Sequence, residues 1–338
     1  MLTTRPRRRT AILTAALLSA ALVLAGCGGN GDRDSAAAPG GSAPGFPVTV
    51  TSDLGEITLQ KKPEKVVVMG DARFVDVLAS LGEPPAFFGS YQDEKTSLQY
   101  YPWLKGQYGK FEPGLATSSG EGSSDPDVEA IGALKPDLII LSTLGDLKDG
   151  TRQQLSQIAP LYADDNPETW TKAVTDMGAI TGKPQEAQQL IAKGEAEFAD
   201  ARKRLAKLQG KTFFAGFVSP DGSVAPFPEM GLFATKLGLK PASNMPVLPD
   251  RGKSISAENR DKIRADVVLA GSVDGDYKKL QSDPRYADLP AVRNRTMLFL
   301  EPLGISPSAT TAIGPASIPW LLGKVVPDLE KSTLNTGR

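Results

Sequence analysis

Short, uninterrupted runs of apolar residues recur along the chain, and they restrict its fold more than any other feature. Each run is bounded by polar residues, glycine or proline. Runs this short and this apolar are typical of strands that are covered on both faces of a mainly parallel sheet. The runs are Val66–Met69, Ala86–Gly89, Leu138–Leu141, Thr212–Phe217, Val267–Ala270 and Met297–Leu300.

Patterns with helical spacing lie between these runs. The sequence predicts helices over Phe74–Leu81, Asp127–Leu134, Thr151–Ile158 and Met230–Leu237. Strands that alternate with helices favour α/β layers built around parallel sheets. The chain is therefore expected to be an α/β protein.

The middle of the chain has a different pattern. Residues 168–180 are predicted to be helical, and Pro184 then opens a longer helix that ends near Leu208. Proline suits the first helical position, and the apolar residues that follow recur at spacings of three and four. A helix of this length extends roughly 37 Å. Such a helix can connect two lobes, although either central helix could instead pack within a single lobe.

These patterns predict two Rossmann-like α/β lobes joined by a long rigid α-helix. The amino-terminal lobe is expected over residues 46–167 and the carboxyl-terminal lobe over residues 210–338. The connecting helices occupy residues 168–209 and include the backbone helix 184–208. Ligands of open parallel sheets sit beyond the carboxyl ends of the strands, so two facing lobes form a ligand cleft between them.

The amino terminus has the features of a secretory signal. Arg5, Arg7, Arg8 and Arg9 precede an uncharged apolar run from Ala11 to Ala25. This run is too short for a stable transmembrane helix, which needs about 20 apolar residues. Residues 1–26 are therefore expected to be a signal peptide.

The residues around Cys27 resemble the lipobox of bacterial lipoproteins. Leu24, Ala25 and Gly26 precede Cys27, and the resemblance implies that this cysteine is acylated and becomes the first residue. Cys27 is the only cysteine, so it has no disulfide partner in the chain. Residues 27–45 then read as a flexible tether of small and polar residues. The protein is expected to be lipid-anchored on the extracytoplasmic face of the cell membrane.

Composition excludes several functions. The chain has 38 basic and 39 acidic residues, and removal of the signal takes away four arginines and no acid. An acidic protein is a poor partner for nucleic acid. The chain contains no histidine, which argues against zinc, copper and haem-iron ligation and removes Ser-His and Cys-His catalytic pairs. We expect no enzyme, no resident metal and no cofactor.

Two blocks identify a family resemblance. Asp125–Ile131 leads into Leu134–Ile140, which is similar to a signature of the substrate-binding proteins of iron–siderophore and cobalamin ABC importers. The opening strand Lys65–Val68, with Pro63 before it, resembles theirs, and so does the carboxyl-terminal pattern from Asp283 to Leu300. The similarity covers roughly residues 48–329. It implies a monomer with two α/β lobes and a long connecting helix.

The resemblance also implies two docking residues. Members of this family present one glutamate on each lobe to arginines of the ABC permease. Glu129 occupies the matching position in the first motif, and Glu258 does so within Ile255–Glu258. Two exposed carboxylates fixed far apart would steer and register a basic surface. A glutamate near a helix start also favours the helix dipole, and both roles can hold at once.

Residues that follow predicted strands, or lie in loops near them, are the candidate ligand contacts. Aromatic rings offer apolar area with a polar tip, and arginine suits anionic oxygens at the rim of a metal chelate. Surface packing is the alternative role for the Tyr-Trp loop. The candidates are Arg73, Tyr91, Trp103, Tyr108, Ser142, Phe227, Arg251, Tyr277 and Glu301.

The expected ligand is a ferric siderophore. A siderophore brings its own oxygen ligands and needs none from the protein. A ferric catecholate complex is strongly anionic and would need several arginines together, but the candidate loops contain only Arg73 and Arg251. A ferric hydroxamate is therefore the favoured type. The arginine that some relatives place before the first docking motif is missing from Thr117–Ser124. Haem or a cobalamin-like solute is an alternative ligand. A lipoprotein that binds a cell-wall component or partner, without transport, is an alternative function.

Overall fold

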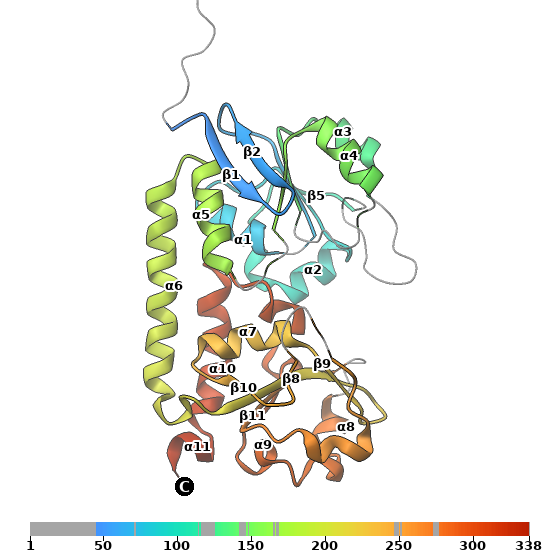
Figure 1. The fold of residues 1–338 in the computed structure, drawn as a ribbon, viewed down its shortest axis with the longest axis vertical. Helices are drawn as coiled ribbons and strands as arrows, with labels where there is room; N and C mark the ends of the chain where they lie inside the picture. Colours follow the sequence, from blue (N-terminus) through green and yellow to red (C-terminus); the bar gives the residue numbers. More distant parts are fainter. Residues whose placement is uncertain are drawn as a thin grey trace, which may run out of the picture. The chain divides into compact units, whose positions relative to one another are not determined.

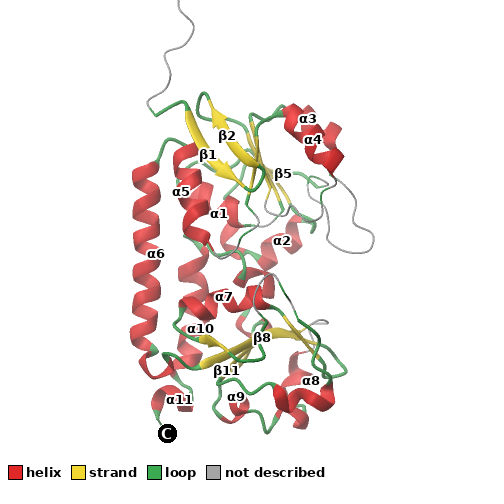
Figure 2. Ribbon diagram, viewed as in Figure 1, coloured by secondary structure: helices red, strands yellow, loops and turns green. Residues whose placement is uncertain are grey.

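The computed structural model describes residues 45–70, 72–113, 115, 126–141, 147, 149–164, 166, 169–246, 250, 252–272 and 277–337. The predicted α/β fold is confirmed, because two mainly parallel sheets with helices packed around them form most of the described chain (Figures 1 and 2). Cys27, the signal peptide 1–26 and nearly all of the tether lie outside these residues. Within them, no helix is both long enough and apolar enough to cross a bilayer.

The amino-terminal lobe is built on a five-stranded parallel sheet of order β5-β4-β3-β6-β7. An antiparallel hairpin of β1 (Val48–Ser52) and β2 (Gly55–Leu59) precedes it. The sheet strands are β3 (Val66–Met69), β4 (Phe87–Gly89), β5 (Lys110–Phe111), β6 (Leu138–Leu141) and β7 (Leu161–Ala163). The helices of this lobe are α1 (Arg73–Ser80), α2 (Glu94–Tyr100), α3 (Val128–Ala133) and α4 (Asp149–Ile158).

The central strand of this sheet is buried on both faces, which explains its continuous apolar run. Successive side chains of a strand point to opposite faces. Val66 and Val68 therefore join the large core that extends into the carboxyl-terminal lobe, whereas Val67 and Met69 join a smaller core with Ile131 and other residues of α3 and α4. All four strand residues are at most 6% exposed.

The carboxyl-terminal lobe has a second sheet, in which β10, β8, β11 and β12 are parallel and β9 is antiparallel to β8. Its strands are β8 (Thr212–Val218), β9 (Val224–Pro226), β10 (Lys240–Pro241), β11 (Val267–Ser272) and β12 (Met297–Phe299). Its helices are α7 (Pro228–Lys236), α8 (Tyr277–Gln281), α9 (Pro290–Arg293), α10 (Ser317–Glu330) and α11 (Thr333–Thr336).

Helices α5 (Trp170–Ile180) and α6 (Pro184–Arg204) form the central connection. A 3-10 turn over Ala206–Leu208 follows α6, so the α-helix ends before the predicted boundary at residue 208. Figure 1 shows α6 lying beside α5 toward one lobe and beside α10 toward the other. One buried apolar cluster runs through these helices and reaches both sheets, which couples the two lobes through shared core packing.

Gly194 lets α5, α6 and α10 approach one another closely. A Cβ atom at this position would lie 2.7 Å from Trp170 Cη2 and 2.9 Å from Ile318 Cδ1. Trp170 and Ile318 are both buried, at 1% and 0% exposure. Neither side chain has free volume to move into, because protein interiors are close-packed. The glycine is therefore needed for contact rather than for backbone freedom.

We expect Gly194→Ala to lower the free energy of unfolding by about 1–3 kcal/mol, because overpacking outweighs the better helix propensity of alanine. Gly323 is the matched control, since it lies in α10 with nothing within 4 Å of an added Cβ. Gly323→Ala should raise the same free energy by up to about 1 kcal/mol. Urea unfolding measures both values, and a stabilising Gly194→Ala would contradict the close contact.

Candidate functional site

The strand order of each sheet marks one place where ligands bind. In the first sheet the chain returns from β5 to β6, beside β3, and in the second it returns from β10 to β11, beside β8. Ligands of open α/β sheets bind beyond the carboxyl ends of the strands at such reversals. Ser272 ends β11 at this edge of the second sheet. The topology therefore predicts that the ligand site is formed by the loops that follow these strands.

Residues of both lobes, including Ser272 at the end of β11, line a cavity with a volume of ≈ 810 Å³. Its size is within the usual range for small-molecule sites, roughly 300–1,000 Å³. Phenol, amide, hydroxyl and carboxylate groups share the wall with apolar surface. The lining residues are Tyr91, Gln92, Gln99, Tyr100, Phe217, Ser272, Glu301, Gly304, Ile305, Ser306, Pro307 and Ser308.

Aromatic rings from both lobes border the cavity. Tyr91 follows β4 and is 43% exposed, the more exposed of the two large hydrophobic side chains on the surface of the described residues. Phe217 comes from β8, and Phe227 packs against it edge-to-face with ring centroids 5.1 Å apart. Phe227 is not itself a lining residue, and it contacts the cavity wall through Phe217. The arrangement offers broad contact area with polar tips.

Glu301 is the one acidic residue among the described lining residues, which include no lysine, arginine or histidine. Its Oε1 accepts a hydrogen bond of 2.6 Å from the Ser272 main-chain N–H. Its Oε2 is shielded from solvent and has no hydrogen-bond partner within the described part of the chain. Burial raises the pKa of Glu301 above its usual value, although the bond from Ser272 opposes this.

The structure brings two of the predicted ligand residues, Tyr91 and Glu301, together in the cavity. Trp103 lies elsewhere, at the lobe junction, where its ring packs against Trp320 of α10 at 5.0 Å. Tyr108 donates a 2.8 Å hydrogen bond to Glu94 Oε1 and packs against Phe88. Tyr277 begins α8 and packs against the main core.

Arg73 requires a correction. Its side chain is almost completely buried, at 1% exposure, and it is not a lining residue of the cavity. Its Nη1 donates to the Asn166 carbonyl at 2.7 Å, and its Nη2 donates to the Asp164 carbonyl at 2.5 Å. The guanidinium therefore fastens the segment after β7 to the start of α1. A position after a strand does not determine the direction of a side chain.

Two of the predicted ligand residues, Ser142 and Arg251, lie outside the described residues. Four further parts of the lining were not among the predicted contacts: Gln92, Gln99, Phe217 and the loop Gly304–Ser308. Phe217 lies near the carboxyl end of a predicted strand, and the loop, rich in glycine, serine and proline, follows the last strand. The strand-end rule could have found both. No group of three or more potential metal ligands occurs among the described residues.

Glu129 and Glu258 are both exposed, one on each lobe. Glu129 lies in the first turn of α3, whose amino end is capped by Asp127 through a 2.9 Å bond from Ala130 N–H. Glu258 lies in the 3-10 helix Ala257–Lys262. Hydrogen bonds from its own main chain and from Ser256 hold the pKa of Glu258 below its usual range. Both carboxylates are free to face a partner surface.

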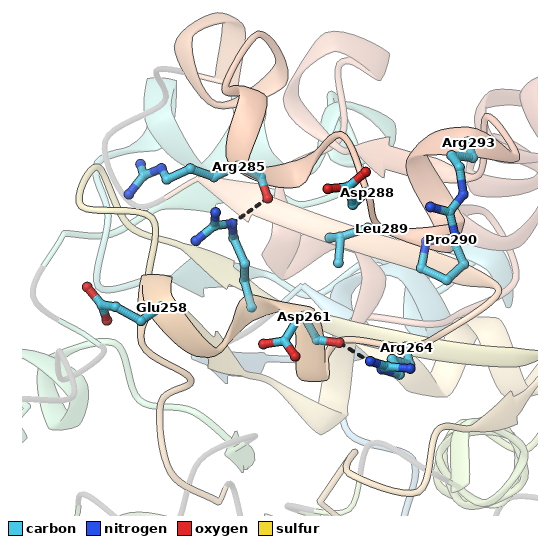
Figure 3. A pocket seen from close by; sticks show the side chains of 9 residues that line it. Glu258, Asp261, Arg264, Arg285, Asp288, Leu289, Pro290 and Arg293 are labelled. Carbon is cyan, nitrogen blue, oxygen red and sulfur yellow. Dashed lines mark hydrogen bonds between the residues drawn. The ribbon is translucent and has the colours of Figure 1, made fainter.

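Glu258 borders a surface depression of ≈ 410 Å³ that carries charges of both signs. Figure 3 shows Glu258 at one end of this depression and Arg264 donating to the Asp261 carbonyl. Arg260 donates to the Arg285 carbonyl. These arginines are tied to main-chain oxygens, so they border Glu258 without an ion pair to it in the described structure. The other lining residues are Asp288, Leu289, Pro290 and Arg293.

Comparison with known proteins decides the family. The periplasmic binding protein family model matches residues 67–302, which is most of the chain. This chain belongs to the periplasmic binding protein family. The match runs from the central strand of the first sheet to the segment after β12, so it includes most of both lobes and the cavity residues from Tyr91 to Glu301 of this periplasmic binding protein.

Relatives with known roles resemble this periplasmic binding protein over most of its length. The iron(3+)-hydroxamate-binding protein FhuD of Bacillus subtilis is 28% identical over 317 residues, covering 86% of this chain and 89% of FhuD. The ferric enterobactin-binding protein FepB of Escherichia coli is 27% identical over 285 residues, covering 75% of this chain and 84% of FepB. These two relatives bind different iron chelates by name.

Two solved structures have the same fold as this chain. The periplasmic solute binding protein of Mycobacterium smegmatis superimposes with a TM-score of 0.65 and 27% identity, covering 83% of this chain and 97% of the other. The PiaA protein of Streptococcus pneumoniae, solved in complex with ferrichrome, gives a TM-score of 0.64 at 23% identity, covering 83% and 97%. At 23% identity, the similarity to PiaA supports the fold and not the ligand.

Proposed function

We propose that this chain is a membrane-tethered solute-binding protein that captures a ferric siderophore, with the hydroxamate type favoured, and delivers it to an ABC permease. The observation that carries the proposal is the ≈ 810 Å³ cavity lined by both lobes in a member of the periplasmic binding protein family. The similarity to an iron(3+)-hydroxamate-binding protein over 86% of the chain supports this ligand class.

The chemistry of the cavity fits an organic chelate. A ferric siderophore presents an apolar and amide-rich rim, because its iron is already enclosed by the oxygens of the chelator. Tyr91, Tyr100 and Phe217 supply ring surface to such a rim, and Gln92, Gln99 and the serine hydroxyls can exchange hydrogen bonds with its amides and carbonyls. Tyr91 and Glu301 are the two originally predicted contacts retained in this proposal, with Phe227 as support for Phe217.

Location and delivery belong to the same proposal. Lipid on Cys27, outside the described residues, would hold the protein on the extracytoplasmic face of the membrane. Glu129 and Glu258 would face cationic residues of the permease, one from each lobe. The protein would act as a monomer, without catalysis and without a resident cofactor. A short tether raises the effective concentration of the loaded protein near its permease.

Tryptophan fluorescence tests the ligand class. Tyr100 lines the cavity and packs edge-to-face with Tyr101, which in turn packs against Trp103, itself in contact with Trp320. A coloured ferric chelate in the cavity is therefore expected to quench emission in a saturable way at micromolar concentration. The measurement is a titration with ferric hydroxamate, catecholate and citrate complexes.

The gallium complex of the same hydroxamate is the control ligand, since it has the same shape and charge but little visible absorption. It should compete with the ferric complex while causing little quenching itself. Haemin and cyanocobalamin test the alternative solutes in the same assay. The proposal fails if none of the ferric chelates changes the emission or if either alternative solute binds in preference to all of them.

A further inference from the structure

The charge of the described cavity lining narrows the ligand class beyond the proposed function, on which this inference rests. Glu301 is the only side chain with a formal charge among the described lining residues, and these include no lysine or arginine. A strongly anionic chelate would meet this carboxylate without a compensating cation. Like charges brought together at close range in a partly dry site oppose binding.

The hydrogen bonding of Glu301 also leaves room for a donor. Oε1 is occupied by the Ser272 N–H at 2.6 Å, whereas Oε2 has no hydrogen-bond partner among the described residues. A carboxylate oxygen that is shielded from water and lacks a donor costs free energy. A donor that arrives with the ligand removes this cost, and a positively charged donor does so most strongly.

We infer that the cavity is selective for ferric hydroxamates with a positively charged or N–H-donating group, and that Glu301 is the specificity-determining residue that accepts this group. The aromatic and amide residues contact the neutral iron–hydroxamate core. The Glu301 carboxylate accepts a hydrogen bond from the substituent, so the affinity depends on the charge of that substituent. The burial that raises the pKa of Glu301 is consistent with a carboxylate that gains from a cationic partner.

A series of three chelates with one shared core tests the inference. Ferrioxamine B carries a free ammonium, its N-acetyl derivative is neutral, and its N-succinyl derivative is anionic. Wild-type protein is expected to bind the ammonium form about tenfold more tightly than the acetyl form and about a hundredfold more tightly than the succinyl form, as charge-assisted hydrogen bonds allow. Calorimetry or fluorescence gives the affinities.

Glu301→Gln removes the charge and keeps an oxygen that can accept from Ser272 N–H. In this variant the three affinities should fall within about threefold of one another, because the ligand substituent no longer meets a carboxylate. The readout is the ratio of affinities, so a general loss of binding does not imitate the effect. Glu56→Gln is the matched control, since Glu56 is exposed on β2 and the same charge change there should leave the wild-type ratios intact.

The outcomes separate this inference from the proposed function. Equal affinities for the three chelates in wild-type protein, or unchanged ratios in Glu301→Gln, would overturn the role of Glu301 and leave siderophore binding standing. Tighter binding of the anionic form would do the same. Failure of all three chelates to bind would overturn both. The wild-type series alone decides the charge preference if the variant does not fold.

Discussion

Replacing Asp76 with alanine is expected to lower the free energy of unfolding by about 2–4 kcal/mol at neutral pH. Asp76 lies in α1 of the amino-terminal lobe and is 1% exposed. Its Oδ1 accepts from Ala316 N–H at 2.8 Å, and its Oδ2 accepts from Ser317 N–H at 2.9 Å. Alanine would leave both main-chain donors without their acceptor in a buried site, at about 1–3 kcal/mol each.

This contact matters because α10 lacks a local cap. No side chain at its amino-terminal boundary accepts from the first-turn N–H groups, so Asp76 supplies the acceptor from the other lobe. A carboxylate at a helix amino terminus also favours the helix dipole. Ser80→Ala is the control variant, since its hydroxyl donates to the same carboxylate at 3.2 Å and its loss should cost less than about 1 kcal/mol. Equal effects of the two variants in urea unfolding would contradict the capping role.

The same residue predicts a pH dependence. Burial raises the pKa of Asp76 to about 6, although the hydrogen bonds from Ala316, Ser317 and Ser80 oppose the shift. The folded protein therefore keeps a proton between pH 4 and pH 6 that the unfolded chain has lost. The stabilisation from this proton is fully present below about pH 4 and is lost as the pH rises through about 6.

Asp76→Asn isolates this contribution, because asparagine does not titrate. The stability of wild-type protein relative to Asp76→Asn should fall by about 2 kcal/mol between pH 4 and pH 6.5. Urea unfolding of both proteins at a series of pH values provides the measurement. A relative stability that rises over this interval would show that the folded protein favours the ionised carboxylate.

Replacing Glu129 and Glu258 together with alanine should reduce uptake of iron from a ferric hydroxamate more than about tenfold, while the affinity for the chelate stays unchanged. Both carboxylates are exposed, and neither lines the cavity. Their removal therefore affects encounter and registration with a cationic permease surface rather than ligand binding. Each single variant should show a smaller loss, because one lobe still docks.

Uptake of radioactive iron into cells and fluorescence titration of the purified variant give the two required values. Glu56→Ala with Asp328→Ala is the matched control pair, which also removes one carboxylate from each lobe but away from Glu129 and Glu258. Asp328 forms an exposed ion pair with Lys331 at 3.3 Å, so its loss should cost little stability. Loss of chelate affinity in the double glutamate variant, or equal uptake by both pairs, would show that these residues do not dock the permease.

Much of the framework followed from local patterns. The buried strands β3, β6, β8 and β11 coincide with the predicted apolar runs, and α6 begins at the predicted proline. By contrast, α10 was not predicted, because Pro327 interrupts its helical pattern and Pro319 lies in its first turn. Its burial against α6 and the cap from Asp76 stabilise a helix that its own sequence supports weakly.

The sequence by itself determined the α/β class, the long connecting helix and the strand ends from which Tyr91 and Glu301 reach the cavity, because burial on one or both faces leaves a periodic record in neighbouring residues. Only the tertiary structure decided the partners of individual side chains. Asp76 caps a helix whose amino-terminal boundary lies 240 residues later in the sequence. Arg73 does not line the cavity and donates to carbonyl groups that are 91 and 93 residues away in the sequence. Such contacts depend on how whole elements pack, and local spacing carries no information about them.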